Sequence, residues 1–272
     1  MACVRHAPSL SDQVMHPTNK ASFGIKINVV SVPVNALSFA QAQKGLLAWG
    51  HARESRYVVL ANVHVVVTAA REPAFGAVVA AADLTTPDGA PIAWMLRKLG
   101  HARQERVSGP DLTWALLQRC AVDGLPVYFF GSSRETLARL AERINVALPK
   151  LVVAGYEAPP FRPMTPEEDA EAVARINASG AGLVFVGLGC PKQEFWMAAH
   201  RGRINAVMLG VGAAFDFHAG TVQRAPKWMR EHGLEWVHRL ASEPRRLWKR
   251  YLVTNTWFVV LAIKQLLLGR RG

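Results

Sequence analysis

Runs of apolar and β-branched residues recur along the chain, and polar or glycine-containing segments separate them. Such runs predict β-strands. Their apolar residues are consecutive and do not alternate with polar ones, which is typical of parallel strands buried on both faces. We expect strands at Ile25–Val32, Tyr57–Val63, Val127–Phe130, Leu151–Val153, Leu183–Val186 and Ala206–Leu209.

The segments between these runs carry helix signals. Ser132 and Glu135 form a capping box, and Thr165 and Glu168 form another with Pro166 at the first helical position. One helical face then follows the first box at Leu137, Leu140, Ala141 and Ile144. Alternating strands and helices predict an α/β fold, a Rossmann-like parallel sheet covered by helices on both faces.

Ligands of such sheets bind beyond the carboxyl ends of the strands, where the connecting loops gather. The loops at those ends are expected at Ala61–Asn62, Thr85–Gly89, Gly131–Ser132, Gly187–Gln193 and Gly210–Gly220. They hold polar residues that the strands lack, so a ligand site is expected among them.

The composition changes after about Gly220. Residues 221–272 hold eleven Lys or Arg against three Glu, so 11 − 3 = +8 of the formal net charge of +12 lies there. We therefore divide the chain into a flexible N-terminal extension (1–22), a Rossmann-like catalytic domain (23–220) and a basic helical membrane-associating appendage (221–272). Leu247–Leu268 is expected to be one long helix, or two helices broken near Asn255.

Several classes of protein are excluded by what the sequence lacks. It has three cysteines without a CxxC pair and no HExxH spacing, which argues against a disulfide framework and a metal site. Its first residues do not form a signal peptide. No run approaches the ~20 apolar residues of a membrane span, since Lys264 interrupts the run from Trp257, so we expect a chain that is not integral to a membrane. The cysteine pattern and the missing signal peptide predict a reducing, cytoplasmic compartment.

The turn GLGCPKQEFW, from Gly187 to Trp196, follows a predicted strand and opens a predicted helix. Its Gly187 and Gly189 begin a dinucleotide-binding fingerprint, but Lys192 stands where the third glycine belongs. A nicotinamide or flavin enzyme is therefore a weak alternative, and the missing GxxxxGK[ST] removes the P-loop nucleotidases. Glu194 is interpreted as a favourable charge in the first helical turn.

Asp88 lies in a Pro-Asp-Gly turn where a strand should end. A carboxylate there can cap the turn, or it can act as a general base over a ligand crevice. Downstream, Arg106 is either a surface charge or an anion contact, and Asp111 is interpreted as the cap of the helix after Pro110.

A set of short motifs, in this order and spacing, resembles one known family. They are Pro87–Gly89, Glu105–Leu112, Gly187–Glu194, Arg224–Pro226, Glu235–Trp236 and Glu243–Arg246. Each is weak alone, but the ordered set from about Ile25 to Tyr251 resembles the WecG/TagA/CpsF glycosyltransferases, which form family 26 of the glycosyltransferase classification.

The resemblance implies an inverting transferase that moves a sugar from a UDP-sugar to a polyprenyl-diphosphate-linked sugar, in the synthesis of bacterial surface polymers. N-acetylmannosamine, its uronic acid and glucose are the donor sugars it suggests. It implies that Asp88 is the general base and that Asn62, Arg106 and Gln193 line the substrate pocket. Many members have a threonine two residues before this asparagine, where the chain has Leu60.

The residues also indicate how the charge of a leaving diphosphate is met. No Asp-x-Asp metal motif is present, and we expect no metal and no cofactor. Lys192, Arg106 and the appendage arginines Arg239, Arg246 and Arg250 can do the same electrostatic work. The turn containing Gly187, Gly189 and Gln193 is expected to face the nucleotide-sugar diphosphate.

Three interpretations of the appendage are open. Its arginines, spaced around Trp236 and Trp248, form a solvated face, a single-stranded nucleic-acid site, or a flap that meets an anionic membrane. The flap is favoured because it also explains the apolar stretch Trp257–Leu268. It places the protein peripherally on the inner face of the plasma membrane, with no nucleic acid as partner. A homo-oligomer is possible, and the sequence does not decide the oligomeric state. A basic single-stranded nucleic-acid-binding protein is the alternative function.

Overall fold

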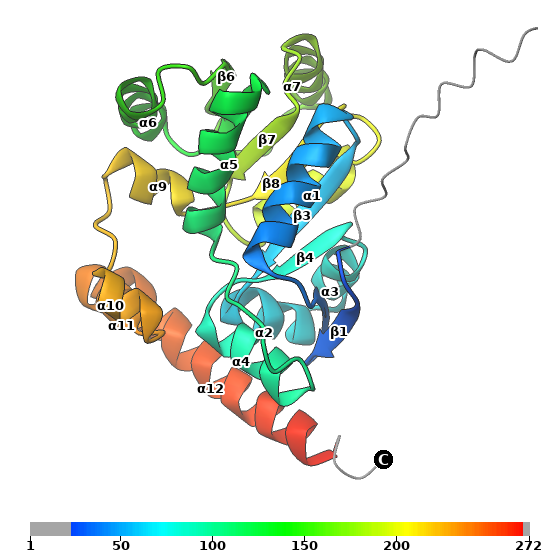
Figure 1. Ribbon diagram of the computed structural model, residues 1–272, viewed down its shortest axis with the longest axis vertical. Coiled ribbons are helices and arrows are strands. Elements are labelled where there is room, and N and C mark those ends of the chain that lie inside the picture. The colour runs from blue at the N-terminus through cyan, green and yellow to red at the C-terminus, as the bar shows by residue number, and fades with distance from the viewer. Residues whose placement is uncertain (1–22, 269–272) are drawn as a thin grey trace, which may run out of the picture.

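A computed structural model describes residues 23–268, so the predicted extension 1–22 and the last four appendage residues lie outside the described part. Its centre is a six-stranded, wholly parallel sheet in the order β4-β3-β8-β7-β5-β6 (Figure 1). The strands are β3 (Arg56–Ala61), β4 (Leu84–Pro87), β5 (Val127–Gly131), β6 (Val153–Glu157), β7 (Leu183–Gly187) and β8 (Val207–Gly210). The predicted α/β class is thereby confirmed.

Each central strand sends alternate side chains into one of two cores. In β5, Phe129 packs on one face and Phe130 on the other, as the two-residue period of a strand requires. The first face is covered by α1 (Phe39–His51), α5 (Gly109–Asp123), α6 (Arg134–Ala147) and α9 (Ala214–Ala219). The opposite face is covered by α2 (Val63–Arg71), α3 (Pro73–Ala80), α7 (Pro166–Ala178) and α8 (Lys192–His200), with α4 (Ala90–Lys98) in the same core.

The N-terminal run does not form the predicted single strand. It folds back as an antiparallel hairpin, β1 (Lys26–Val29) and β2 (Val32–Asn35), outside the main sheet. The turn lacks the usual Asn-Gly or Gly signal, and Val30 takes the positive φ of 62° itself. The Asn35 amide accepts a hydrogen bond from the Thr85 backbone N–H at 3.0 Å, so the hairpin is tied to β4.

The helices begin at N-capping residues near the predicted positions, and one of these caps is shifted by one residue. The capping box of Thr165 and Glu168 is confirmed at α7. The cap of α6 is Ser133 and not Ser132, because Ser132 has a φ of 64° and cannot precede the helix directly. The cap of α2 is Asn62, whose side chain accepts from the Val65 N–H at 3.2 Å.

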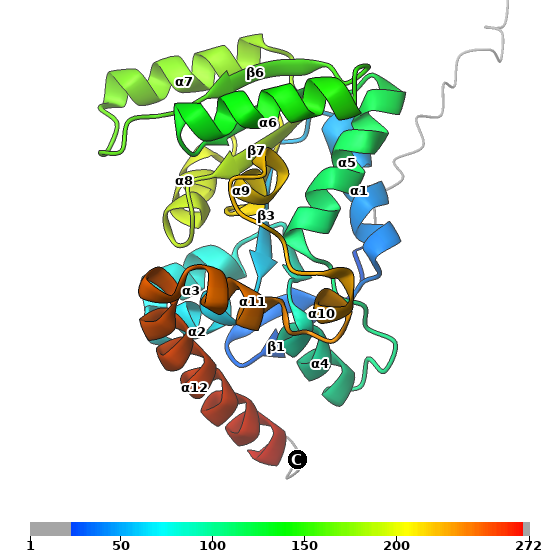
Figure 2. The same ribbon diagram turned by 90° about the vertical axis from the view of Figure 1, so that its left-hand side faces the viewer.

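The appendage contains α10 (Lys227–Glu231), α11 (Glu235–Ser242) and α12 (Pro244–Leu268), so the predicted long helix is one unbroken helix. These three helices lie together at one end of the molecule, away from α6 and α7 (Figure 2). Leu247, Thr254, Phe258 and Ala262 of α12 are buried, and the helix packs against α2.

The expectation that no segment suits a membrane span was wrong. Helix α12 has 25 residues and a hydropathy of 1.5 over its most apolar window, which by length and composition alone is enough to cross a bilayer. The expectation required an unbroken apolar run, whereas a helix tolerates the single charge of Lys264. Only 17% of that window is buried, so most of this apolar helix is open to its surroundings.

Candidate active site

A cavity of about 820 Å³ opens beyond the carboxyl ends of β3, β4, β7 and β8. Asn62 follows β3, Asp88 follows β4, Gly187 ends β7 and Val211 follows β8, and all four line the cavity. The opposite wall comes from α11 and α12. The predicted loop Gly131–Ser132 does not line it, because β5 lies beyond β7 in the sheet; the Ser132 N–H donates to the Gly187 carbonyl at 3.0 Å.

The Asp88 carboxyl is held from two sides. Its Oδ1 accepts from the Gly109 backbone N–H at 3.2 Å, and its Oδ2 accepts from the Asn62 amide at 3.4 Å. Burial raises the pKa of Asp88 to about 6, although these two hydrogen bonds act in the opposite direction. A carboxyl with a pKa near neutrality, open to a cavity, is suited to take a proton from a bound hydroxyl.

Leu60 lies next to this carboxyl and lines the cavity. A Cβ at Gly109 would come within 2.9 Å of Leu60 Cδ1, so the glycine leaves room for the leucine. The same Cβ would lie 4.0 Å from Asp88 Oδ2, which is an ordinary contact and places Leu60 and Asp88 on the same side of Gly109. The surface that a threonine would make polar is therefore apolar here.

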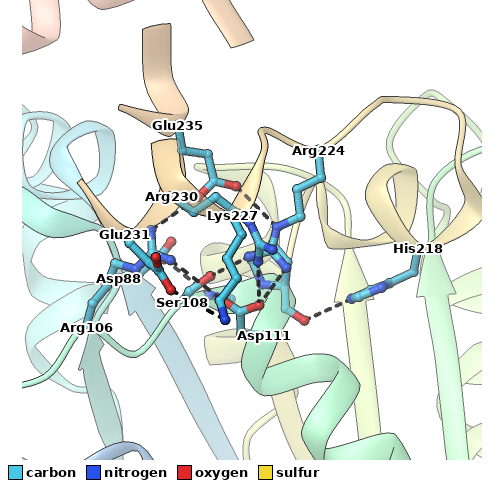
Figure 3. A network of polar contacts seen from close by, with 12 residues as sticks. Asp88, Arg106, Ser108, Asp111, His218, Arg224, Lys227, Arg230, Glu231 and Glu235 are labelled. Carbon is cyan, nitrogen blue, oxygen red and sulfur yellow. Dashed lines mark hydrogen bonds and ion pairs between the residues drawn. The ribbon is translucent and has the colours of Figure 1, made fainter. Parts of the chain in front are cut away.

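A network of five ionic side chains joins the core to the appendage (Figure 3). Glu235 of α11 accepts from Arg106 at 3.2 Å and from Arg224 at 3.3 Å. Asp111 accepts from Arg224 at 2.6 Å and from Arg230 at 3.4 Å. These ion pairs hold the appendage over the Asp88 side of the cavity. They join residues that are far apart in the sequence and come together only in the folded chain.

This network corrects the interpretation of Asp111 as a helix cap. The cap position of α5 belongs to Ser108, and no side chain caps the helix there. Asp111 lies in the first turn, where it pairs with the arginines, and its pKa is lowered by Arg224 in spite of burial. The local sequence contains no sign of this, since both partner arginines come more than a hundred residues later.

The appendage arginines form the facing wall of the cavity. Arg239, Arg246 and Arg250 all line it, and Glu243 Oε2 lies 3.8 Å from Arg239 and 3.1 Å from Arg246. Arg250 has a buried Nε without a hydrogen-bond partner among residues 23–268. Burial and the charge of Arg250 lower the pKa of His64 to about 4, so His64 is neutral at physiological pH and the arginines supply the charge.

Only some residues of the glycine turn from Gly187 to Gln193 reach the cavity. Gly187, Gly189, Cys190 and Gln193 line the cavity, whereas Lys192 is exposed and is not among its lining residues. Successive helical residues point about 100° apart, so the first turn of α8 directs Gln193 inward and Lys192 outward. The structure therefore does not bring Lys192 to the site.

Glu194 lies in the first turn of α8, as predicted, but it is not a surface charge there. Its side chain is fully buried behind Gln193, whose Nε2 donates to Glu194 Oε1 at 2.8 Å. The sequence signal for a helix start concerns only local charge, and it cannot show which way the first turn faces.

Comparison with known proteins assigns the family. Residues 27–272 match the Glycosyl transferase WecG/TagA/CpsF family. The chain belongs to that family. It is also similar to the N-acetylglucosaminyldiphosphoundecaprenol N-acetyl-β-D-mannosaminyltransferase of Bacillus spizizenii, at 31% identity over 229 residues, which covers 81% of this chain and 86% of that protein. The predicted resemblance is confirmed, and the family identifies the protein as a transferase, which favours this function over nucleic-acid binding.

Proposed function

We propose that the protein transfers a sugar, with inversion, from a UDP-sugar to a polyprenyl-diphosphate-linked sugar. The observation that carries the proposal is the Asp88 carboxyl, with a pKa near 6, in a cavity whose opposite wall is three arginines. By its name, the Bacillus relative transfers N-acetylmannosamine to a polyprenyl-diphosphate-linked N-acetylglucosamine. An N-acetylmannosamine donor is therefore the first to test, ahead of its uronic acid and glucose.

In the proposed reaction, the Asp88 carboxylate takes the proton of the acceptor hydroxyl as its oxygen attacks the anomeric carbon. A bond forms between that oxygen and the anomeric carbon, and the bond to the diphosphate oxygen breaks on the opposite side. One displacement inverts the anomeric centre, and UDP leaves with the bonding electrons. A single base is sufficient for such a step.

The charges around the cavity support a role in holding diphosphates. Arg106 lies on the Asp88 side, and Arg239, Arg246 and Arg250 lie on the other. Arginine binds phosphate oxygens with paired, charge-assisted hydrogen bonds, and fixed cations stabilise a leaving diphosphate. We propose that these side chains act without a metal, so transfer should continue in the presence of excess EDTA.

We further propose that the appendage holds the protein peripherally on the cytoplasmic membrane face. Trp248, Leu252, Ile263 and Leu267 are exposed along α12, and interfacial binding grows with the apolar area inserted. The packing of α12 against α2 and its place in the cavity wall support a helix that lies on the bilayer and does not cross it. Basic residues add about 1 kcal/mol each near an anionic surface.

The test is UDP release from a panel of UDP-sugars in the presence of anionic liposomes, with and without a short-chain polyprenyl-diphosphate N-acetylglucosamine. Wild type should release UDP from one donor only when the acceptor is present. Asp88→Asn should lose at least about 100-fold in rate, the lower range for a general base. Asp123→Asn, at the far end of α5, is the matched control and should act like wild type. An active Asp88→Asn would exclude Asp88 as the base.

A further inference from the structure

The amide of Gln193 occupies a narrow space made by two glycines. Its side chain is 5% exposed, and a Cβ at Gly210 would lie 3.0 Å from Nε2 while one at Gly212 would lie 3.5 Å from Oε1. A larger residue at Gly210 would push directly on the amide. The two glycines at the end of β8 therefore leave space for the Gln193 amide and restrict it to one position.

One hydrogen bond fixes which end of the Gln193 amide faces Glu194. Glu194 is 0% exposed and its Oε1 accepts from Gln193 Nε2 at 2.8 Å. Burial raises the pKa of Glu194, but a carboxyl oxygen accepts from an amide N–H in either protonation state. With the amide nitrogen donating to Oε1 of Glu194, the carbonyl oxygen of Gln193 points away from it. Gln193 lines the cavity, and Glu194 does not.

The carbonyl oxygen of Gln193 is left without a partner. Its Oε1 is buried and accepts no hydrogen bond from any residue in the described range 23–268. A buried acceptor left unsatisfied is unfavourable, so a ligand group that donates to it is favoured. Gln193 lines the cavity, so a ligand bound there is placed to bring a donor to this oxygen.

We infer that Glu194 is a positioning residue that fixes the Gln193 amide so that its carbonyl oxygen accepts a hydrogen bond from an O–H or N–H of the nucleotide sugar. The inference rests on the proposed function. Gln193 lies at the β7 and β8 end of the cavity, whereas Asp88 follows β4, and β3 lies between in the sheet. The group that Gln193 meets is therefore remote from the attacking hydroxyl, on the sugar or on the uridine.

The test compares two substitutions of similar size. Glu194→Gln keeps an oxygen that can accept from Gln193, and Glu194→Met does not. By calorimetry, Glu194→Met should bind the UDP-sugar about tenfold more weakly than wild type, the loss of one hydrogen bond, while Glu194→Gln stays within about twofold. If UDP alone weakens equally, the contact is to the uridine; if only the UDP-sugar weakens, it is to the sugar. Unchanged binding by a folded Glu194→Met would overturn the inference.

A measurement without ligand separates this inference from the proposed function. The side-chain amide protons of Gln193, assigned in nitrogen-15 NMR spectra by their loss in Gln193→Met, should exchange slowly with water in wild type and Glu194→Gln. They should exchange fast in Glu194→Met. Fast exchange in wild type would overturn the orientation of the amide. Slow exchange in a wild type that binds no UDP-sugar would instead refute the proposed function and leave the orientation standing.

Discussion

The amide of Asn62 serves Asp88 and a helix at once. Its Oδ1 accepts from the Val65 N–H and so caps α2, while its Nδ2 donates to Asp88 Oδ2 at 3.4 Å. The cap fixes which end of the amide faces Asp88, so the carboxyl meets a donor and not a second acceptor. Asn62, at the end of β3, thereby helps to orient the Asp88 carboxyl at the end of β4.

The first prediction concerns the pH dependence of transfer. Because the base acts only when ionised, kcat/KM should rise as pH increases through about 6 and then level. The hydrogen bond from Asn62 lowers the pKa of Asp88, so Asn62→Ala should move this rise to higher pH. The lost cap should also lower the free energy of unfolding by about 1 kcal/mol.

A matched control separates the two effects of Asn62. Ser133 caps α6 in the same manner but lies outside the cavity lining. Ser133→Ala should cost a similar free energy of unfolding and leave the pH profile of wild type in place. An Asn62→Ala profile that coincides with wild type would show that the amide does not tune Asp88.

The second prediction is a shift of the pH profile of kcat/KM in the opposite direction, to lower pH. The charge of Glu235 raises the pKa of Asp88 and that of Arg106 lowers it. Glu235→Gln should therefore move the rise in kcat/KM to lower pH. Glu231→Gln, on the same appendage, should leave the profile unchanged, because the one ion pair of Glu231 within residues 23–268 is with Lys227 at 3.7 Å. A shift to higher pH in Glu235→Gln would contradict the described electrostatics.

The sequence was a good guide to the site where local chemistry decides position. The turn at Asp88 and the loop at Asn62 follow strands that the apolar runs predicted, and parallel strands bring their ends together. It was a poor guide where tertiary contact decides. The turn at Val30 has no sequence signal, and nothing local distinguishes exposed Lys192 from buried Glu194. Pairs such as Arg106 and Glu235 depend on how the appendage docks.

The third prediction concerns the exposed apolar stripe of α12. Leu252→Gln combined with Ile263→Gln should reduce binding to anionic liposomes by at least about tenfold, because each removes apolar area that would enter the interface. Both side chains are more than half exposed, so folding should be unaffected. Val146→Gln removes an exposed valine from α6 and should bind like wild type in sedimentation with vesicles. Undiminished binding by the double variant would place the membrane contact elsewhere.

The last prediction decides whether α12 lies on the bilayer or crosses it. Gln265, near the end of α12, accepts from the Val30 N–H at 2.7 Å and donates to the Asn28 carbonyl at 2.6 Å, so the helix is fastened to the hairpin turn. Gln265→Ala should lower the free energy of unfolding by about 1–2 kcal/mol and speed hydrogen exchange at Val30. Lys264→Ala, an exposed neighbour, should do neither. A helix that crosses the bilayer must leave the hairpin, so liposomes would then speed exchange at Val30 in wild type. A peripheral helix keeps both hydrogen bonds, and Val30 should stay protected with vesicles bound.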